Sequence, residues 1–530
     1  MVFCQRMLAI GGAWLLATTV PYAAQAQKHG GVLQVYTVDS PASMSIHEEQ
    51  TVFAERRMLG VFNNLITFDP KIRQNSINSI VPDLATEWSW NEDGTELTLK
   101  LRQGVKWHDG KPFTAADVKC TWDLVTGIAK EKLRVNPRKP WYRNLEEVTT
   151  SGDYEVRFRL KQPQPAFVMM LASGFSPVYP CHVPPTQMRQ HPIGTGPFKF
   201  VEFKPNQDIK ITRNPEYWKK DRPYLDGIEW TVIKNMSTAV LGLVSGKFDL
   251  SLGLTIPNVK NVREQLPDAQ CDLSPGNVSR NLIVNRNAPP FDNADLRRAM
   301  ALSIDQQAYI GILTEGLGKI GGVMLPPPEG IWGMPPDVLH KLPGYDPDIG
   351  KRREEARQIM KKLGYSPDKP LGVKISTRDL PFFREPAVIL NDQRKQIYID
   401  GEIEPIDTTS WFPKIMRKDY SVGMNLTGNS LDDPDQNFFE NFLCGGLANI
   451  DGYCNPGVEK LMIAQSMEAN QDRRKTLVWE IERLLAEDVA RPMIFYAPAA
   501  NCWNPKLKGL TIPINGIYNG WRMEEAWLDN

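Results

Sequence analysis

The short motifs that build hydrolytic or phosphate-binding sites are missing from this sequence. It contains no Gly-x-Ser-x-Gly nucleophile motif and no Gly-x-x-x-x-Gly-Lys-Ser/Thr loop. The run that starts at His47 reads His-Glu-Glu-Gln-Thr, so it lacks the second histidine of a zinc-binding His-Glu-x-x-His helix. In the glycine-rich stretch 194–197, Pro197 removes a backbone donor that a phosphate cradle would need. We therefore expect no enzyme activity and no cofactor.

Acidic and histidine residues give two weaker candidates for ion binding. Asp432, Asp433 and Asp435 could bind calcium, but their spacing differs from that of an EF-hand loop, which favours a solvated turn around Pro434. The histidines are far apart in sequence, and only His47 lies in a loop that a ligand could reach after the first predicted strand. We expect no metal site.

The cysteines indicate an oxidising compartment. Cys444 and Cys454 bracket the stretch 445–453, whose glycines and asparagine would let the chain turn back, so we predict a disulfide between them. Free buried thiols and a metal site are the alternatives, and metal is disfavoured because no Cys-x-x-Cys or neighbouring histidine completes a ligand set. Spacing does not pair the remaining four, which are Cys120, Cys181, Cys271 and Cys502.

The first 26 residues read as a cleavable signal peptide. A single basic residue, Arg6, precedes the apolar run 8–20, and Ala24-Gln25-Ala26 places small residues at the cleavage site. The alternative is an uncleaved N-terminal anchor, although the run is shorter than the roughly 20 residues that span a bilayer. We expect export to the periplasm. The rest of the chain has a near-neutral charge, which gives no electrostatic reason to expect nucleic acid as a partner.

Periodicity predicts mixed α/β structure in two lobes. Residues 30–38 read as a buried strand, and apolar residues alternate with polar ones in 97–101 and 154–160. Helices are predicted after the capping side chains Thr114, Asp348 and Asp472, and from Asn293 onward, where apolar residues recur at a spacing of four. Strands dominate the first half and helix–strand alternation the second, which is typical of two α/β lobes.

Several long segments of the sequence have a pattern that a known family shares. The first is LATEWSWNEDGTELTLKLRQGVKWHDGKPFTAADVKCTWD at 84–123. Others are GTGPFKF (194–200), RNPEYWKKDRPYLDGIEW (213–230), LVSGKFDL (243–250), NRNAPPFDNADLRRAMALSIDQQAYI (285–310) and YDPDIGKRREEARQIMKKLGY (345–365). These segments resemble solute-binding protein family 5, the receptors of dipeptide, oligopeptide and nickel ABC importers, and they follow one another in that family's order over nearly the whole chain.

The resemblance implies the two-lobed periplasmic-binding-protein fold of type II, the Venus-flytrap architecture, with an extra subdomain in the first lobe. The first lobe would comprise residues 27–285, with the subdomain at 61–192, and the C-terminal return 500–530. The second lobe would comprise 286–499, with chain crossings near 284–285 and 499–500. Two lobes joined in this way close on a ligand held between them.

The resemblance also implies a non-enzymatic function. We expect the substrate-binding component of an ABC importer, a monomer that captures a peptide or a peptide-like or organic-acid solute and delivers it to the permease subunits in the membrane. A receptor for a metal complex or haem is the alternative on the same fold. A secreted hydrolase and a chaperone-like role are the remaining candidates.

Residues of both lobes are predicted to contact the ligand. In related receptors the loop after the opening strand lines the cleft; here it holds Ser40, Pro41, Ala42, Ser43 and Met44, with His47 close behind. Arg378 and Asp379 end a predicted strand of the second lobe, where binding clefts open, and Trp332 and Trp411 are candidate aromatic walls. An ion pair of Arg378 with an acid of the chain, and burial of either tryptophan in a core, are the alternatives.

One stretch departs from the family pattern. Residues 426–435 resemble the segment where peptide receptors place an aspartate against the ligand's amino terminus, but that position falls on Asn429 or Ser430. A desolvated ammonium needs a negative partner, and Asp432 would have to substitute. A peptide with a blocked amine, an opine-like conjugate and another organic acid therefore stay open as ligands. The aromatic C-terminal run 517–529 could bring Asn519 and Arg522 to the cleft.

Overall fold

The computed structural model describes residues 27–530, so the predicted signal peptide lies outside the described residues. The first lobe is built on a seven-stranded sheet, in which β1 runs parallel to both of its neighbours, β10 and β11. In spatial order the strands are β12 (Gln270–Asp272), β18 (Asn501–Trp503), β11 (Leu250–Leu252), β1 (Val32–Thr37), β10 (Gly227–Val232), β9 (Asp208–Arg213) and β8 (Phe198–Lys204). Helices α5 (Met236–Val244) and α6 (Ile256–Gln265) pack together beside β11 and β18.

The second lobe is built on a five-stranded sheet. Its order is β15 (Ile399–Ile406), β14 (Leu371–Arg378), β16 (Val422–Gly428), β13 (Pro275–Val284) and β17 (Met493–Pro498). Helices α8 (Gln306–Thr314) and α11 (Pro381–Lys395) pack on this sheet, and α7 (Ala294–Leu302) packs against α10 (Ile349–Lys362). The inward side chains of these strands and helices share one apolar core. A further group of helices flanks this core, comprising α9 (Pro336–Leu339), α12 (Thr408–Met416), α13 (Pro434–Asn441), α14 (Pro456–Met467) and α15 (Gln471–Glu487).

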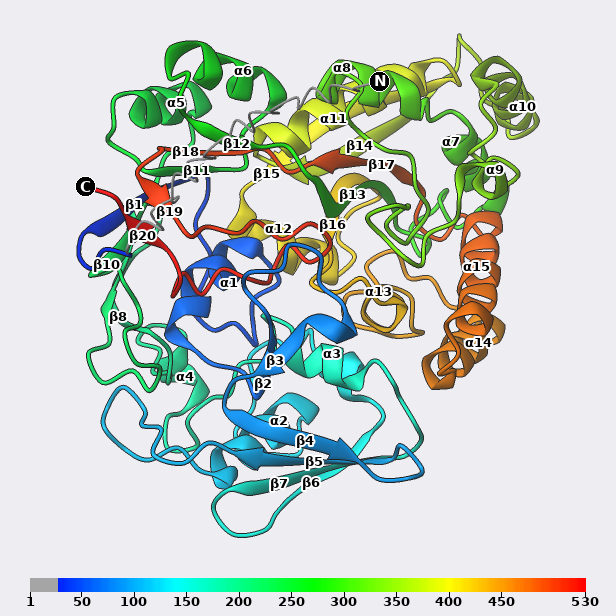
Figure 1. Ribbon diagram of the computed structural model, residues 1–530. Coiled ribbons are helices and arrows are strands. Elements are labelled where there is room, and N and C mark those ends of the chain that lie inside the picture. Colours follow the sequence, from blue (N-terminus) through cyan, green and yellow to red (C-terminus); the bar gives the residue numbers. More distant parts are fainter. Residues whose placement is uncertain (1–26) are drawn as a thin grey trace, which may run out of the picture.

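A four-stranded antiparallel sheet forms a separate layer at the bottom of Figure 1. Its order is β4 (Ala85–Trp90), β5 (Glu96–Leu101), β7 (Glu155–Leu160) and β6 (Leu145–Thr150), and α2 (Ala115–Thr126) packs on it. The hairpin of β2 (Ile66–Phe68) and β3 (Ile80–Pro82) contacts α3 (Phe167–Ala172), while the short α4 (Pro185–Met188) precedes β8. These segments share a continuous core with the first lobe.

The chain passes between the two large sheets twice. It leaves the first sheet after β12 and enters the second at β13, then returns between β17 and β18. The first passage therefore lies between Asp272 and Pro275, earlier than the predicted 284–285, because β13 pairs along its length with β16 of the second sheet. The second passage lies at 499–500, between the end of β17 and the start of β18. The C-terminal strands β19 (Leu507–Lys508) and β20 (Trp527–Leu528) end beside β1, where Lys28 pairs with Asp529 at 2.6 Å.

Local sequence signals placed most elements well. Thr114 caps α2, Asn293 accepts hydrogen bonds from two backbone N–H groups at the start of α7, and Asp348 accepts one, from Lys351, at the start of α10. The capping prediction for Asp472 was wrong, because Asn470 caps α15 and accepts from the backbone N–H of Asp472 itself.

Three disulfides link the six cysteines of the described chain. Cys444–Cys454, the predicted pair, is one of them, and Cys120–Cys181 and Cys271–Cys502 are the others. Cys271 and Cys502 lie on neighbouring strands, β12 and β18, close to both passages between the sheets. Within residues 27–530, no helix is both long enough and apolar enough to cross a membrane.

Candidate ligand-binding site

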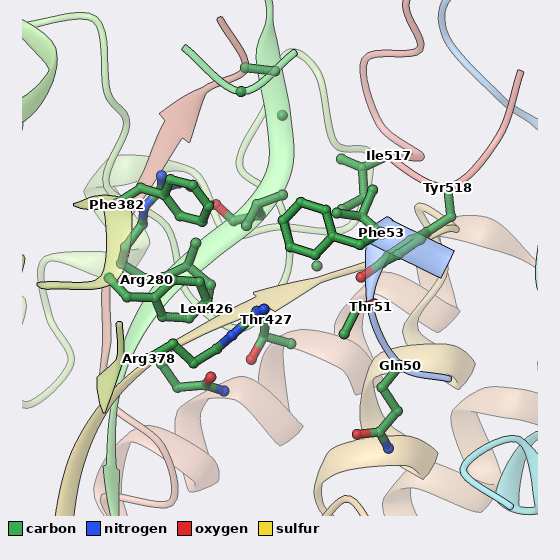
Figure 2. A pocket seen from close by; sticks show the side chains of 18 of the residues that line it. Gln50, Thr51, Phe53, Arg280, Arg378, Phe382, Leu426, Thr427, Ile517 and Tyr518 are labelled. Atoms are coloured by element: carbon green, nitrogen blue, oxygen red, sulfur yellow. Dashed lines mark hydrogen bonds between the residues drawn. The ribbon is translucent and has the colours of Figure 1, made fainter. Parts of the chain in front are cut away.

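A cavity of about 270 Å³ lies between the two lobes. The first lobe contributes α1 (Val52–Met58) and the end of β11, and the second lobe contributes β13, β16 and the start of α11. Figure 2 shows Ile517 and Tyr518 of the C-terminal segment on one side, Arg280, Phe382 and Leu426 on the other, and the Phe53 ring between them. Its volume lies near the lower end of the range for small-molecule sites, which is about 300–1,000 Å³.

Helix α1 supplies four residues to the cavity wall. Val52 and Phe53 come from its first turn, and Arg56 and Arg57 come from its last turn. The guanidinium of Arg57 is held by the chain itself, since it donates to the backbone oxygens of Phe53 and Asp39 and to the Thr37 hydroxyl. Burial lowers the pKa of Arg57 to about 9. Arg57 therefore fixes the end of β1 against α1.

Arg378, at the end of β14, bridges the two lobes. Its guanidinium lies 3.0 Å from the carboxylate of Asp39, which follows β1 in the first lobe, and the Thr408 hydroxyl donates to the same carboxylate. The side chains of Arg378 and Asp39 are 7% and 5% exposed, and the guanidinium lies over the ring of Phe383. A buried pair of this kind is satisfied only while the lobes are together. The sequence left two roles for Arg378, a contact with the ligand and an ion pair with an acid of the chain, and the structure shows the ion pair.

Two further charged wall residues are neutralised by neighbours. Arg491 pairs with Asp451 at 2.6 Å and donates to the side-chain oxygen of Asn441. Glu440, at the end of α13, accepts from Arg138 and from the indole of Trp141, both at 3.2 Å. Because Arg138 belongs to the first-lobe side and Glu440 to the second, this pair also spans the cleft.

Arg56 and Arg280 are different, because no carboxylate within the described chain lies in ion-pair range of either. Arg56 stacks on Trp521 at 4.3 Å, and Arg280 lies 5.3 Å from the ring centre of Phe495. Burial lowers the pKa of both to about 10, and the Nε–H of each lacks a partner among residues 27–530. Each lobe thus presents one guanidinium to the cavity with open hydrogen-bonding capacity.

The loop predicted to line the cleft lies behind the wall. Ser40, Pro41, Ala42, Ser43 and Met44 are not wall residues, and four of these five are buried. Ser43 donates to Glu49 at 2.9 Å, and the backbone N–H of Met44 donates to Arg189 near the small subdomain. The loop packs between the subdomain and the first lobe, so the next element, α1, forms the wall.

His47 is also a structural residue here. Its Nε2 lies 2.9 Å from the backbone oxygen of Pro177, and its ring packs edge-on against Tyr179. Burial lowers the pKa of the imidazole to about 4, so it is neutral at physiological pH. His47 does not reach the cavity wall.

The other predicted wall residues also lie elsewhere. Trp332 is in the core beside α13 and α15 and donates its indole N–H to the backbone of Asp432, and Trp411 is fully buried in a small core near β13. Both tryptophans thus lie in cores, the alternative given to them from sequence. Asp379 points to solvent and pairs with Arg384.

Asn429 and Ser430 bind protein groups. Asn429 donates to the side chain of Asn277, and Ser430 lies 2.8 Å from the Ser173 hydroxyl across the cleft. Asp432 accepts from the backbone N–H of Ile331, and burial raises its pKa to about 7. None of the three is a wall residue, so the segment that departs from the family pattern contributes no carboxylate to the cavity.

The C-terminal segment contributes through other residues than those expected. Asn519 donates to the backbone oxygen of Ser430 at 2.6 Å, and Arg522 pairs with Asp83 inside the first lobe at 2.8 Å. Ile517 and Tyr518 are the wall residues instead. Sequence reasoning missed Arg56, Arg280 and Tyr518. A signal existed for Arg280, since an arginine within the apolar strand 278–284 is unusual in a buried sheet.

The chain matches the model of the bacterial extracellular solute-binding proteins, family 5 middle, over residues 79–449. It belongs to this family. The family's fold accounts for the two lobes, the small subdomain and the cavity between them, and a solved member agrees. The binding protein DppA from Helicobacter pylori, in complex with the peptide STSA, superimposes with a TM-score of 0.84 at 21% identity, covering 95% of this chain and 99% of that one.

Curated relatives differ in the solute that they are named for. A probable di/tripeptide-binding protein 5 of Pseudomonas aeruginosa is 23% identical over 86% of this chain and 88% of its own length. Heme-binding protein A of Haemophilus influenzae is 28% identical over 58% of this chain and 56% of its own. Family membership therefore does not identify the solute, and its chemical class has to be inferred from the residues that line the cavity.

Proposed function

We propose that this protein is the periplasmic substrate-binding component of an ABC importer, which captures a small peptide-like or organic-acid solute by closure of its lobes. The observation that carries the proposal is a cavity whose wall comes from both lobes and whose rim is held by polar contacts across the cleft. A solute in this cavity contacts both lobes only when they are closed, so binding stabilises the closed form. The permease subunits then distinguish the closed receptor from the open one.

The two passages between the sheets are the proposed hinges. They lie next to each other, since β13 and β17 are neighbours in one sheet and β12 and β18 are neighbours in the other. A rotation about both changes few backbone angles while each lobe keeps its own core, as in hinge motions generally. This scheme gives a first lobe of 27–274 with 500–530 and a second lobe of 275–499, which differs from the boundaries predicted from sequence at the first crossing.

The cavity favours a peptide-like or organic-acid solute over haem. Haem iron in proteins is held by His, Met, Cys or Tyr side chains, and among the described wall residues only Tyr518 is of these types. Within residues 27–530 there is also no group of three metal-ligating side chains. The wall instead combines arginines with apolar side chains, which suits a solute that has an acid group and an apolar part.

Native mass spectrometry of the protein purified from the periplasm tests the proposal. We expect a bound species of a few hundred daltons that partial unfolding removes and that raises Tm when it is added back. A protein that emerges empty, and whose Tm no solute from a broad library raises, would count against the proposed function.

A further inference from the structure

Positively charged side chains outnumber negatively charged ones on the cavity wall. Five arginines line it, against one carboxylate, Glu440. Arg378 and Arg491 have carboxylate partners, and Glu440 is itself held by Arg138. Arg57 is engaged by the chain's own oxygens. Arg56 and Arg280 are left over, one from each lobe.

The acid next to Arg56 in sequence is Glu55, and it offsets the charge of Arg56 only in part. Glu55 attracts Arg56 electrostatically but forms no hydrogen bond with it: Glu55 is fully buried, is not a wall residue, and neither of its carboxylate oxygens has a hydrogen-bond partner among the described residues. Burial raises the pKa of this carboxyl well above its usual range, which favours the neutral acid. No carboxylate of the described chain lies in ion-pair range of Arg280, and burial is the sole cause of its lowered pKa.

Arg56 and Arg280 are half-buried, and the Nε–H of each is buried without a partner among the described residues. A guanidinium partly withdrawn from water without a carboxylate costs free energy, and an anion supplied by a ligand offsets that cost. A guanidinium and a carboxylate form charge-assisted hydrogen bonds, which are among the strongest in proteins. The cavity therefore has two places for an oxyanion, and a solute that reached both would link the lobes.

The same wall offers nothing to an ammonium group. Glu440 is the single wall carboxylate in the described chain, and its oxygens already accept from Arg138 and Trp141. Asp39 is committed to Arg378 and Thr408, and Asp432 lies behind the wall. An ammonium in this cavity would sit among arginines without a negative partner, which is strongly unfavourable.

We infer that Arg56 and Arg280 are ligand-binding residues, and that the solute is a small carboxylic acid or amine-blocked peptide-like acid without a free ammonium. This inference rests on the proposed function and narrows its solute class. Phe53, Phe382, Leu426 and Ile517 take the apolar part of the solute.

A matched set of probes tests the solute class. The full chain, stripped of cargo, is titrated calorimetrically with small mono- and dicarboxylic acids and with acetylated dipeptides. The free dipeptides of the same sequence, and the acetylated dipeptide amides, serve as counterparts. We expect the tightest binding among the acids that lack an ammonium, with the amides not binding. A free dipeptide that binds as tightly as its acetylated form overturns the inference, as does an amide that binds as well as its acid.

Variants test the two arginines. Arg56→Gln and Arg280→Gln should each raise the Kd of the best acid about 10- to 100-fold, because each removes a charge-assisted contact. Arg157→Gln, on the exposed face of β7, is the control and should leave Kd unchanged. The empty Arg280→Gln protein should have a Tm equal to or above that of the wild type, because it loses a half-buried charge that has no carboxylate partner in the described chain. An unchanged Kd in both variants, or a lowered Tm of empty Arg280→Gln, contradicts the assigned role.

Identifying the co-purified solute distinguishes a failure of this inference from a failure of the proposed function. If no acid in the set binds, the co-purified solute decides: an acid without an ammonium supports the inference, and a solute with a free ammonium refutes it while the receptor function stands. A protein that carries no solute and binds none from either set fails the proposed function itself.

Discussion

Closure of the lobes should depend on the Asp39–Arg378 pair, and replacing one carboxylate oxygen of Asp39 with an amide nitrogen tests this. Asp39→Asn keeps the shape of the side chain and an oxygen that accepts from the backbone N–H of Ser40, but it removes the charge opposite Arg378. Breaking a buried ion pair by removing one partner costs about 3–5 kcal/mol. Since the Thr408 hydroxyl still accepts from the Nε and Nη2 of Arg378, the guanidinium keeps a hydrogen-bond acceptor, and we take a value below that range, about 2 kcal/mol.

That cost falls on the closed state, because in an open receptor water solvates Arg378. The equilibrium for closure shifts by the same amount, and the apparent Kd rises by the corresponding factor, about 30-fold. Calorimetric titration with the solute recovered from the wild-type protein measures it. Asp379→Asn is the matched control, since Asp379 pairs with Arg384 at the surface, where such pairs contribute about 0–1 kcal/mol. If Asp39→Asn binds with an unchanged Kd, the pair is not a closing contact and the reasoning fails.

Two further predictions concern stability. Asp432→Asn should raise Tm above pH 7 and leave it unchanged near pH 4. The folded protein keeps the Asp432 proton up to about pH 7, whereas the unfolded chain releases it near pH 4. Wild-type stability therefore falls as pH rises through this window. Thermal melts from pH 4 to 8 check this, and a difference that does not vary with pH would refute the assigned burial cost. Replacing both cysteines of Cys271–Cys502 with serine should lower the free energy of unfolding more than the same change at Cys444–Cys454. The first pair is separated by 231 residues and the second by 10, which gives chain-entropy contributions of about 5 and about 3 kcal/mol. Urea unfolding compares them, and an equal or reversed loss would contradict the loop-length argument.

Local features were predictable because their cause is local. A capping side chain, a period of two or an apolar spacing of four acts within a few residues, so α2 and α10 begin at their predicted caps and α7 begins directly after Asn293. The capping error at α15 came from two adjacent capping residue types, Asn470 and Asp472, between which local pattern does not choose.

The cavity wall was harder to predict because it depends on packing between distant segments. The loop 40–44 follows β1 directly and is polar enough for a binding loop, yet the subdomain covers it. Arg378 reached the wall as expected, but its charge is met by Asp39, 339 residues away in sequence. A charged residue within an apolar strand, as at Arg280, is the kind of local conflict that marks a functional position.

The central claim is that a solute bound in this cavity holds the two lobes together. Small-angle X-ray scattering of the cargo-stripped protein, before and after the recovered solute is added, tests it most directly. The account predicts that the radius of gyration falls on binding, and that Asp39→Asn requires about 30 times more solute for the same contraction. A radius of gyration that stays constant while the solute binds at full occupancy would contradict closure as the mechanism of capture.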